Sequence, residues 1–450
     1  MTKDKARSVA LEVIYQVLEE GAYANLLLDK ALFACQELSS RDKGFVTELV
    51  YGTIRQKGAL DWVINQFAKQ KTEKQEKWVR NILRLGAYQL LYLDKVPASA
   101  AINEAAELAK EYASQGAAGF VNGILRNLER NREQIKYPDK GKNPAANYAV
   151  RYSYPQWIVE DWLKNYGRKD AEKLCQYFNE PAKLWIRTNS LKISRDELQK
   201  MLAEEGIETR KSLYAPLGLE ILSEISLHNN EAFKKGLFLV QDESSMILGT
   251  VSGVRPGMKV LDICAAPGGK TTHMAQLMEN KGEIIACDIH EHRLELIKEN
   301  AGKLGIDIIK TRLQDGRTIG EDLKEEFDVV LLDAPCSGLG VLGRRADLRW
   351  KKRRGDIKEL AALQKELLAQ AQGLVKKGGS LIYSTCTTTK AEDEEAAAWF
   401  LENYEEFSLD KRLPFLDEAG NPLGMHKLSP LKEGTDGFFI ALFKRGGNDE

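Results

Sequence analysis

The stretch MKVLDICAAPGGKT (residues 258–271) combines the three signals that decide the fold of the chain. Its first half is a short apolar run, which is typical of a buried β-strand. Two adjacent glycines follow in a turn, and the continuation KTTHMAQLMEN predicts a helix. A strand, a glycine-containing turn and a helix in this order indicate the first unit of an alternating α/β sheet.

The alternation continues towards the C-terminus. Strands are predicted at GEIIACD, IDIIKTRLQD, FDVVLLD and GSLIYST, and helices at HEHRLELIKENAGKLG and IKELAALQKELLAQAQGLVKKG. The last apolar segment, DGFFIALFKR, follows a non-helical connection and is expected to add an antiparallel edge strand. Residues 237–446 are therefore predicted to form a doubly wound, mostly parallel, Rossmann-like α/β sheet.

Two further regions are predicted before this sheet. Residues 1–138 contain segments of helical periodicity such as ARSVALEVIYQVLEE and GFVNGILRNLERN, which predict an all-α domain. The polar stretch KYPDKGKNPAAN (136–147) has the composition of a linker. Residues 148–235 follow the order helix, strand, helix, strand, strand, which predicts a small α+β module of the ferredoxin or RRM type.

The composition is that of a globular protein of two or three domains. Of 450 residues, 29% are charged and 43% hydrophobic, and because the net charge is −1 any nucleic-acid surface has to be local. The sequence has neither a signal peptide nor an apolar stretch of about 18 residues, so no membrane segment and a cytoplasmic location are expected. Six cysteines without a Cys-x-x-Cys pair, and five histidines without ligand spacing, predict neither a disulfide framework nor a metal site.

Glycines and carboxylates follow the predicted strands at the ends where open α/β sheets bind ligands. Gly268 and Gly269 follow the first strand and allow a ligand to approach the backbone closely. Asp288 ends the second strand, where a carboxylate can accept both hydroxyls of a ribose. Asp315 follows the third strand and Asp333 ends the fourth.

Two kinds of nucleotide site are excluded by the same turn. A Walker A loop needs a glycine where this chain has Cys264, and a G-x-G-x-x-G dinucleotide motif is not present. A nucleoside site that does not have to hold a pyrophosphate remains. The sequence therefore predicts the sheet of an S-adenosylmethionine-dependent methyltransferase.

Two cysteines follow predicted strands in similar settings. Cys336 lies in DAPCSG and Cys386 lies in YSTCT, fifty positions later (386 − 336). Both are expected at the ligand-binding edge of the sheet, so their chemistry alone does not decide which of them is a nucleophile.

The motifs DICAAPGGKT, DAPCSG and YSTCT closely resemble those of the RNA (cytosine-5) methyltransferases of the NOL1/NOP2/Sun family. The run VQDESS (240–245) resembles the segment that leads into their catalytic domain. Farther towards the N-terminus, LLLDKAL, SSRDKGFVTELVYGTIR and ASAAINEAAELAK resemble NusB-like RNA-binding domains. One departure is Ala346 in GRRADLRW, where the family usually has proline, which puts a local turn in doubt.

The resemblance implies methylation of a cytosine of 16S rRNA with S-adenosylmethionine. It assigns Cys386 as the nucleophile and Cys336 as the residue that helps to break the covalent adduct. Asp333 is a candidate for contacting N3 and the exocyclic amine, and Lys270 for holding the base or lowering the pKa of a thiol. The residues expected to contact the cofactor are Cys264, Ala265, Ala266, Pro267, Gly268, Gly269, Lys270, Asp288, Asp315 and Asp333.

A basic run directly after DAPCSG is a candidate RNA surface, because arginine and lysine can meet phosphates while an aromatic ring stacks on an unpaired base. Its members are Arg344, Arg345, Arg349, Trp350, Lys351, Lys352, Arg353 and Arg354.

Two alternatives to 16S rRNA methylation remain open. The same chemistry on tRNA or another rRNA would use the same motifs. A non-catalytic RNA-binding protein with a methyltransferase fold is a second alternative, which two intact cysteine motifs disfavour. In either case the target base has to be unpaired or flipped, and a monomer is expected.

Overall fold

The computed structural model describes residues 4–323, 326–417 and 419–447. It divides into two compact units. The first contains Met1–Pro181 together with Leu342–Arg354, and the second contains Ala182–Val341 together with Gly355–Glu450. The chain thus leaves the second unit after Val341 and returns to it at Gly355.

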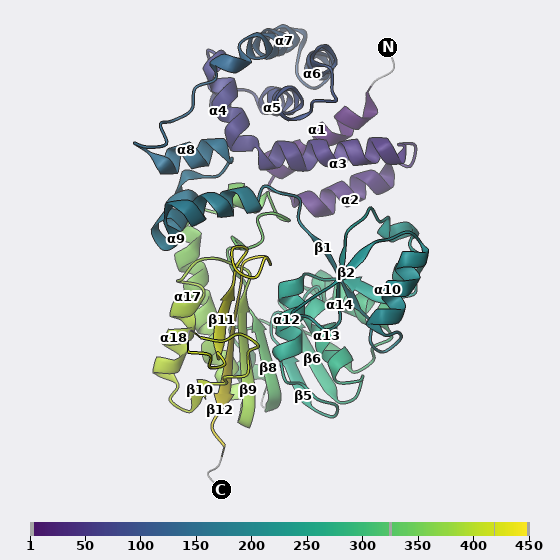
Figure 1. Ribbon diagram of the computed structural model, residues 1–450, viewed down its shortest axis with the longest axis vertical. Helices are drawn as coiled ribbons and strands as arrows, with labels where there is room; N and C mark the ends of the chain where they lie inside the picture. Colours follow the sequence, from purple (N-terminus) through teal and green to yellow (C-terminus); the bar gives the residue numbers. More distant parts are fainter. Residues whose placement is uncertain (1–3, 324–325, 418, 448–450) are drawn as a thin grey trace. The chain divides into compact units, whose positions relative to one another are not determined.

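The first unit is helical, as its sequence periodicity predicts (Figure 1). A shared core of buried aliphatic side chains, including Leu11, Ile14, Leu49 and Leu125, joins the helices between residues 5 and 130. Its longer helices are α1 (Lys5–Glu19), α2 (Ala24–Ala34), α3 (Ser40–Arg55), α4 (Lys57–Phe67), α5 (Lys77–Tyr92), α6 (Ala98–Tyr112), α7 (Gln115–Arg130), α8 (Pro144–Arg151) and α9 (Gln156–Tyr177).

Helix α8 begins inside the stretch 136–147 that was predicted as a linker. Asn143 accepts a hydrogen bond from the Ala146 amide at 3.0 Å, and Pro144 occupies the first helical position. An asparagine cap followed by proline is a helix-start signal, which the linker-like composition of the stretch obscured.

Part of the basic run is structural. Arg349, on the short helix α16 (Leu348–Lys351), is fully buried in the first unit. Its guanidinium donates to the carbonyl oxygens of Ser153 at 3.0 Å and Phe178 at 3.1 Å, and to Asn179 Oδ1 at 2.9 Å. Burial leaves Arg349 no surface for a phosphate, so the prediction that it contacts RNA is corrected.

Trp350 is held in a similar way. Its indole Nε1 donates to the Ile54 carbonyl at 2.6 Å, and the Lys57 ammonium lies 4.7 Å from its ring centroid. The ring therefore packs on α3 and α4, and the prediction that it stacks on an RNA base is not supported. Ala346, where the family usually has proline, is buried in the same core.

The second unit contains two sheets. The smaller is antiparallel, in the order β2–β3–β1–β4, and α10 (Arg195–Glu204) starts at a capping box made by Ser194 and Glu197. This is the ferredoxin-like α+β module that the sequence predicts. Its strands are β1 (Leu184–Thr188), β2 (Thr209–Lys211), β3 (Gly218–Ile221) and β4 (Phe238–Val240).

The larger sheet has the order β10–β12–β9–β8–β5–β6–β7, with β11 paired to β12. The five strands from β9 to β7 are parallel, and β12 is antiparallel to β9, as DGFFIALFKR predicts. The strands are β5 (Lys259–Asp262), β6 (Glu283–Asp288), β7 (Ile309–Leu313), β8 (Phe327–Asp333), β9 (Val375–Thr385), β10 (Phe407–Leu409), β11 (Met425–Leu428) and β12 (Phe438–Arg445).

Helices cover both faces of the larger sheet (Figure 1). Alternate strand residues face opposite ways: Leu331 packs with α12 (Glu243–Val251) and α13 (Gly269–Leu277), and Leu332 packs with the helices on the other side. The helix α14 (Glu291–Leu304) lies on the same face as α13, and the opposite face carries α17 (Arg354–Ala371) and α18 (Glu394–Asn403). The helix predicted over 357–378 ends at Ala371, because the sequence from Val375 onwards already belongs to β9.

Within the described ranges, no helix is long and apolar enough to cross a membrane. In the same residues, no group of three or more histidine, cysteine, aspartate or glutamate side chains is placed to hold a metal ion.

Arg349→Met should destabilise the first unit. The substitution leaves the buried carbonyl groups of Ser153 and Phe178 without their donor, which costs about 2–4 kcal/mol. Urea unfolding followed by circular dichroism measures the loss. Arg353→Met, at an exposed position, is the control and should change stability by less than about 0.5 kcal/mol. Equal stability of the two variants would contradict a structural role for Arg349.

Candidate active site

The strands β8 and β9 bring the two motif cysteines together. They pair in parallel with Asp333 opposite Ser384, so the loops that follow them leave the same edge of the sheet. Cys336 and Cys386 lie on these loops with their Sγ atoms 3.4 Å apart. The backbone amide of Cys386 also lies 3.4 Å from the Sγ atom of Cys336. The site therefore contains an adjacent pair of free thiols.

The environment distinguishes the two thiols. The hydrogen bond with Cys386 raises the pKa of Cys336 well above its usual range, and burial raises it further. The Cys336 thiol therefore holds its proton more strongly than an ordinary cysteine does. Cys386 is half-buried and lies beside Lys270, whose ammonium interacts with it electrostatically.

A lysine–carboxylate pair lies beside the thiols. Lys270 Nζ donates to Asp333 Oδ2 at 2.5 Å, and Ser384 Oγ donates to Asp333 Oδ1 at 2.7 Å. Burial lowers the pKa of Lys270, but Asp333 outweighs this effect and the net pKa is raised, so Lys270 is a cation. The ammonium also interacts electrostatically with Cys386 and lies 5.1 Å from the Phe438 ring centroid.

Glu392 ties the two cysteine loops together. This fully buried carboxylate accepts hydrogen bonds from the Ser337 amide at 2.7 Å and the Ser337 hydroxyl at 2.6 Å. It also accepts from the Thr389 hydroxyl at 2.7 Å. Ser337 follows Cys336, and Thr389 lies three residues after Cys386, so one carboxylate fixes both loops.

A close backbone approach completes this arrangement. The Gly340 amide donates to the Cys386 carbonyl at 3.1 Å, and the Gly437 amide donates to the Gly340 carbonyl at 2.8 Å. A Cβ atom at Gly340 would lie 2.0 Å from the Gly437 carbonyl oxygen. Only glycine fits at Gly340, because any side chain would separate these loops.

A cavity of about 210 Å³ opens at the neighbouring strand ends. Three of the residues predicted to contact a cofactor, Cys264, Asp288 and Asp315, line it. Arg293 lies 3.2 Å from Asp288 Oδ2, and Arg317 pairs with Asp315 at 2.6 Å and lowers its pKa. The remaining lining residues are Ile263, Ile289, Arg293, Gln314, Gly316, Arg317, Pro335, Leu363 and Leu367.

Side chains from α14 hold the glycine turn. Arg293 donates to the Ala266 carbonyl at 3.2 Å, and Asn300 donates to the Pro267 carbonyl at 2.8 Å. Gly268 has a φ of +93° and precedes α13, a conformation that favours glycine. The turn predicted from AAPGG is therefore present, and hydrogen bonds from α14 hold its backbone in place.

Asp262, at the end of β5, was not predicted as a site residue. Thr271 Oγ1 donates to its Oδ2 at 2.7 Å, but its buried Oδ1 has no hydrogen-bond partner among the described residues. Burial raises the pKa of this carboxyl to about 7. A cationic group beside it would satisfy the unpaired oxygen and favour ionisation. The position of Asp262 at a strand end was the signal that could have identified it.

Arg187, on β1 of the smaller sheet, was also missed. It is fully buried and donates to the Gly269 carbonyl at 2.6 Å and to Thr272 Oγ1 at 2.9 Å. It also donates to Gln241, which lies in the VQDESS run. The smaller sheet thus fixes the start of α13, the helix that carries Lys270.

The predicted site residues therefore fall into three groups. Cys336, Cys386, Asp333 and Lys270 form one cluster. The residues predicted for the cofactor lie in the adjoining turn and cavity. The basic run belongs to the first unit, where Lys351 donates to the Ala22 carbonyl at 2.7 Å and Arg354 pairs with Glu160 at 2.6 Å. RNA contact by its exposed members stays a prediction.

Glu392→Gln should destabilise the second unit and change the thiol pair. An uncharged amide accepts fewer and weaker hydrogen bonds, so we expect a loss of about 2–3 kcal/mol in urea unfolding and a changed alkylation rate of Cys386. Glu394→Gln, on the partly exposed next turn, is the control and should leave the alkylation rate unchanged. An unchanged rate in Glu392→Gln would show that the carboxylate does not position the loops.

Family models match three consecutive parts of the chain. Residues 4–130 match the NusB family, and residues 154–228 match the ferredoxin-like domain of RsmF/B-like methyltransferases. Residues 251–444 match the model described as 16S rRNA methyltransferase RsmB/F. The three matches follow the helical region, the smaller sheet and the larger sheet in order.

Full-length relatives extend these matches. The chain is 41% identical to the probable ribosomal RNA small subunit methyltransferase B of Bacillus subtilis, over 99% of this chain and 100% of the relative. The corresponding protein of Synechocystis is 37% identical over 98% of this chain and 99% of its own length.

Two solved structures are similar to this chain in both sequence and fold. The crystal structure of PH0851 is 29% identical, with a TM-score of 0.85 over 99% of both chains. The structure of NSun6 from Pyrococcus horikoshii with SFG is 27% identical, with a TM-score of 0.60 over 65% of this chain and 99% of that one. With identity sustained along its whole length and the paired cysteine motifs in place, the chain belongs to the 16S rRNA methyltransferase RsmB/F family.

Proposed function

We propose that the protein methylates C5 of a specific cytosine in 16S rRNA, using S-adenosylmethionine and a covalent cysteine–C6 adduct. The observation that carries the proposal is the pair of thiols 3.4 Å apart beside the Lys270–Asp333 pair. The relatives named as small subunit methyltransferases, which match along the whole chain, support the 16S rRNA substrate.

The chemistry explains why a thiol is needed. C5 of cytosine is a weak nucleophile, and addition of a thiolate to C6 makes it enamine-like. C5 can then take a methyl group, after which its proton is removed and the thiolate leaves as the 5,6 double bond re-forms. The base has to be unpaired or flipped out of its stack for either face to be reached.

Cys386 is proposed as the attacking thiol. The pKa of its neighbour Cys336 is raised, chiefly by the hydrogen bond with Cys386, and the Lys270 ammonium lies where it can stabilise negative charge on the Cys386 sulfur. Cys336 lies within contact distance of Cys386 and is proposed to assist release of the adduct: as a thiolate it would accept the C5 proton, and as a thiol it would donate its proton to the departing Cys386 sulfur.

Asp333 and Lys270 are proposed to hold the cytosine edge. Asp333 is partly exposed, and its oxygens already accept from Lys270 and Ser384, which fixes the plane of the carboxylate. In this position it can accept a hydrogen bond from the exocyclic amine, while Lys270 supplies positive charge as electron density builds on the ring.

The cavity at the strand ends fits the cofactor proposed for it. Asp288 and Asp315 can accept hydrogen bonds from ribose hydroxyls. The apolar side chains that line the cavity suit a purine ring. The unpaired Oδ1 of Asp262 can accept from the ammonium of the methionine end. When bound, S-adenosylmethionine supplies an electrophilic methyl group. The solved relative determined with SFG supports a ligand-binding role for this fold.

Substitution of each cysteine should give a different result. Cys386→Ala should lose methyl transfer by at least about 10³-fold and form no adduct, because no thiolate attacks C6. Cys336→Ala should accumulate a denaturation-resistant protein–RNA complex, because the adduct forms but breaks down slowly. Labelled methyl transfer and denaturing gels measure both effects, with small-subunit RNA and tRNA compared as substrates. Exchanged phenotypes would reverse the assigned roles, and transfer to tRNA alone would contradict the 16S rRNA substrate.

Cofactor affinity should rise with pH around neutrality. Asp262 has a raised pKa of about 7 and has to lose its proton before it pairs with a cation, so binding is weak below that pKa and strong above it. Kd should fall about tenfold between about pH 6 and 8 by titration calorimetry. Asp262→Asn is the control: it should bind more weakly and lose this pH dependence. Parallel pH profiles in the two proteins would contradict the role of Asp262.

A further inference from the structure

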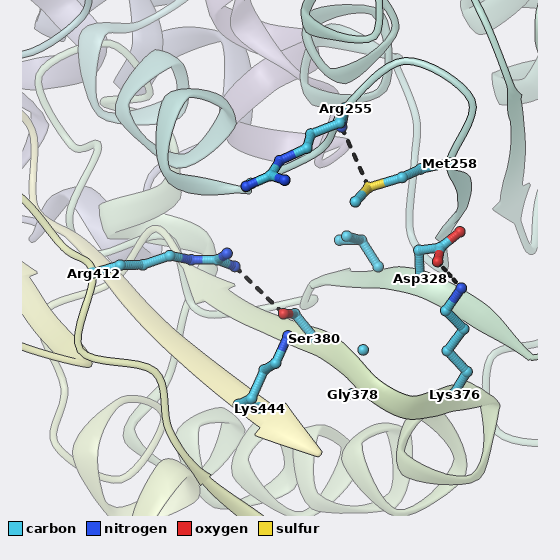
Figure 2. A pocket seen from close by; sticks show the side chains of 11 residues that line it. Arg255, Met258, Asp328, Lys376, Gly378, Ser380, Arg412 and Lys444 are labelled. Carbon is cyan, nitrogen blue, oxygen red and sulfur yellow. Dashed lines mark hydrogen bonds and ion pairs between the residues drawn. The ribbon is translucent and has the colours of Figure 1, made fainter. Parts of the chain in front are cut away.

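A second hollow of about 210 Å³ lies in the second unit, away from the cysteine loops. Figure 2 shows side chains from several segments converging on it. Four of its eleven lining residues are basic, namely Arg255, Lys376, Arg412 and Lys444, and one, Asp328, is acidic.

The hollow lies at the amino ends of the parallel strands. Asp328 is near the start of β8, and Asp333 of the thiol cluster ends the same strand. Asp333 lies five positions after Asp328 (333 − 328), which corresponds to about 17 Å along the strand. Lys444, near the end of β12, reaches the same edge because β12 runs antiparallel to β9. The hollow is therefore distinct from the cavity at the carboxyl edge.

The positive charge of the hollow is only partly neutralised. Asp328 is the one acidic residue in the lining, and its carboxylate pairs with Lys376 and accepts from the Lys259 amide at 2.8 Å. Arg412 is paired with Asp410, so Arg255 and Lys444 remain as the cations of the lining without an acidic partner among the described residues. This local excess contrasts with the overall net charge of −1.

Arg412 is held in place before any ligand binds. Its guanidinium donates to the Ser252 carbonyl at 3.1 Å and lies 3.3 Å from Asp410 Oδ2. A Cβ atom at Gly253 would lie 2.3 Å from the guanidinium, so this glycine leaves the space that Arg412 occupies. The same group reaches Ser380 Oγ at 3.4 Å, in the floor of the hollow (Figure 2).

Arg255 and Lys444 differ from Arg412. Both are exposed, and neither side chain has a hydrogen-bond or ion-pair partner among the residues that the structure describes. They extend towards the hollow from opposite sides (Figure 2). An anion placed between them would meet a guanidinium fork, an ammonium and the fixed Arg412.

We propose that this hollow binds a phosphate group, and that the phosphate belongs to the backbone of the RNA substrate. Guanidinium and ammonium groups around one concavity are the donors that phosphate oxygens prefer. Because the cationic rim is exposed, a nucleotide chain can continue on both sides of the bound phosphate. The assignment to RNA rests on the proposed function, whereas binding of a phosphate as such does not.

The test uses the full-length Arg255→Ala/Lys444→Ala variant. Its affinity for a 16S rRNA fragment, measured by fluorescence anisotropy, should fall about tenfold, and the slope of log K against log salt should decrease by about 1. Cofactor affinity and the methylation rate at saturating RNA should be unchanged, because these residues lie outside the catalytic machinery. Lys411→Ala/Lys298→Ala, which removes two exposed cations outside the hollow, is the matched control and should retain wild-type affinity and slope.

A second arm uses inorganic phosphate, followed by ³¹P line broadening. Unchanged RNA affinity and unchanged phosphate binding in the variant would overturn the proposal. If the variant lost phosphate binding but kept its RNA affinity, the assignment of the phosphate to the RNA backbone would be wrong. The ligand of the hollow would then be a free phosphate. If the wild-type protein transferred no methyl group yet the variant still bound RNA more weakly, the proposed function would fail while the phosphate site stood.

Discussion

The parallel pairing of β8 with β9 is the constraint on which the site depends. This register sets Asp333 opposite Ser384, so two loops from segments fifty residues apart begin side by side. The thiol pair, the Asp333–Ser384 hydrogen bond and the contact between Gly340 and Gly437 all follow from it. A shift of one residue would turn every side chain of one strand to the other face of the sheet and separate the thiols.

Two buried charged side chains hold the loops and the helix of the site in fixed positions. Glu392 and Arg187 are both fully buried, where an unpaired charge would be costly, so each is stable only with its hydrogen bonds in place. Glu392 spans the two cysteine loops, and Arg187 links the smaller sheet to the helix carrying Lys270. The smaller sheet therefore contributes to the site without supplying a reacting group.

The sequence predicted the parts of this arrangement that depend on local pattern. Strand alternation, the glycine turn and the antiparallel β12 follow from periodicity and spacing, and the cysteines follow from strand ends. Arg187 could not be predicted, because its role depends on contact between two sheets that no local pattern encodes. Arg349 and Trp350 were predicted to contact RNA because they lie in a basic run that follows DAPCSG and contains an aromatic residue. In the structure Arg349 is buried and the Trp350 indole donates to the Ile54 carbonyl, so packing among helices decides their role. Asp262 was accessible to the strand-end argument and is the first residue of DICAAPGGKT, but the glycine turn that follows it was taken as the ligand-binding part of that motif.

The central claim is that Cys386, and not the adjacent Cys336, forms the covalent bond to cytosine. It is tested most directly in the wild-type protein, with 5-fluorocytosine in the target RNA, because fluorine at C5 cannot leave as a proton and the adduct persists. Nuclease digestion followed by peptide mass spectrometry identifies the cysteine that carries the nucleotide. The account predicts a methylated fluorocytidine nucleotide on the peptide containing Cys386. Finding it on the Cys336 peptide, or finding no covalent nucleotide during active methyl transfer to normal RNA, would contradict the account.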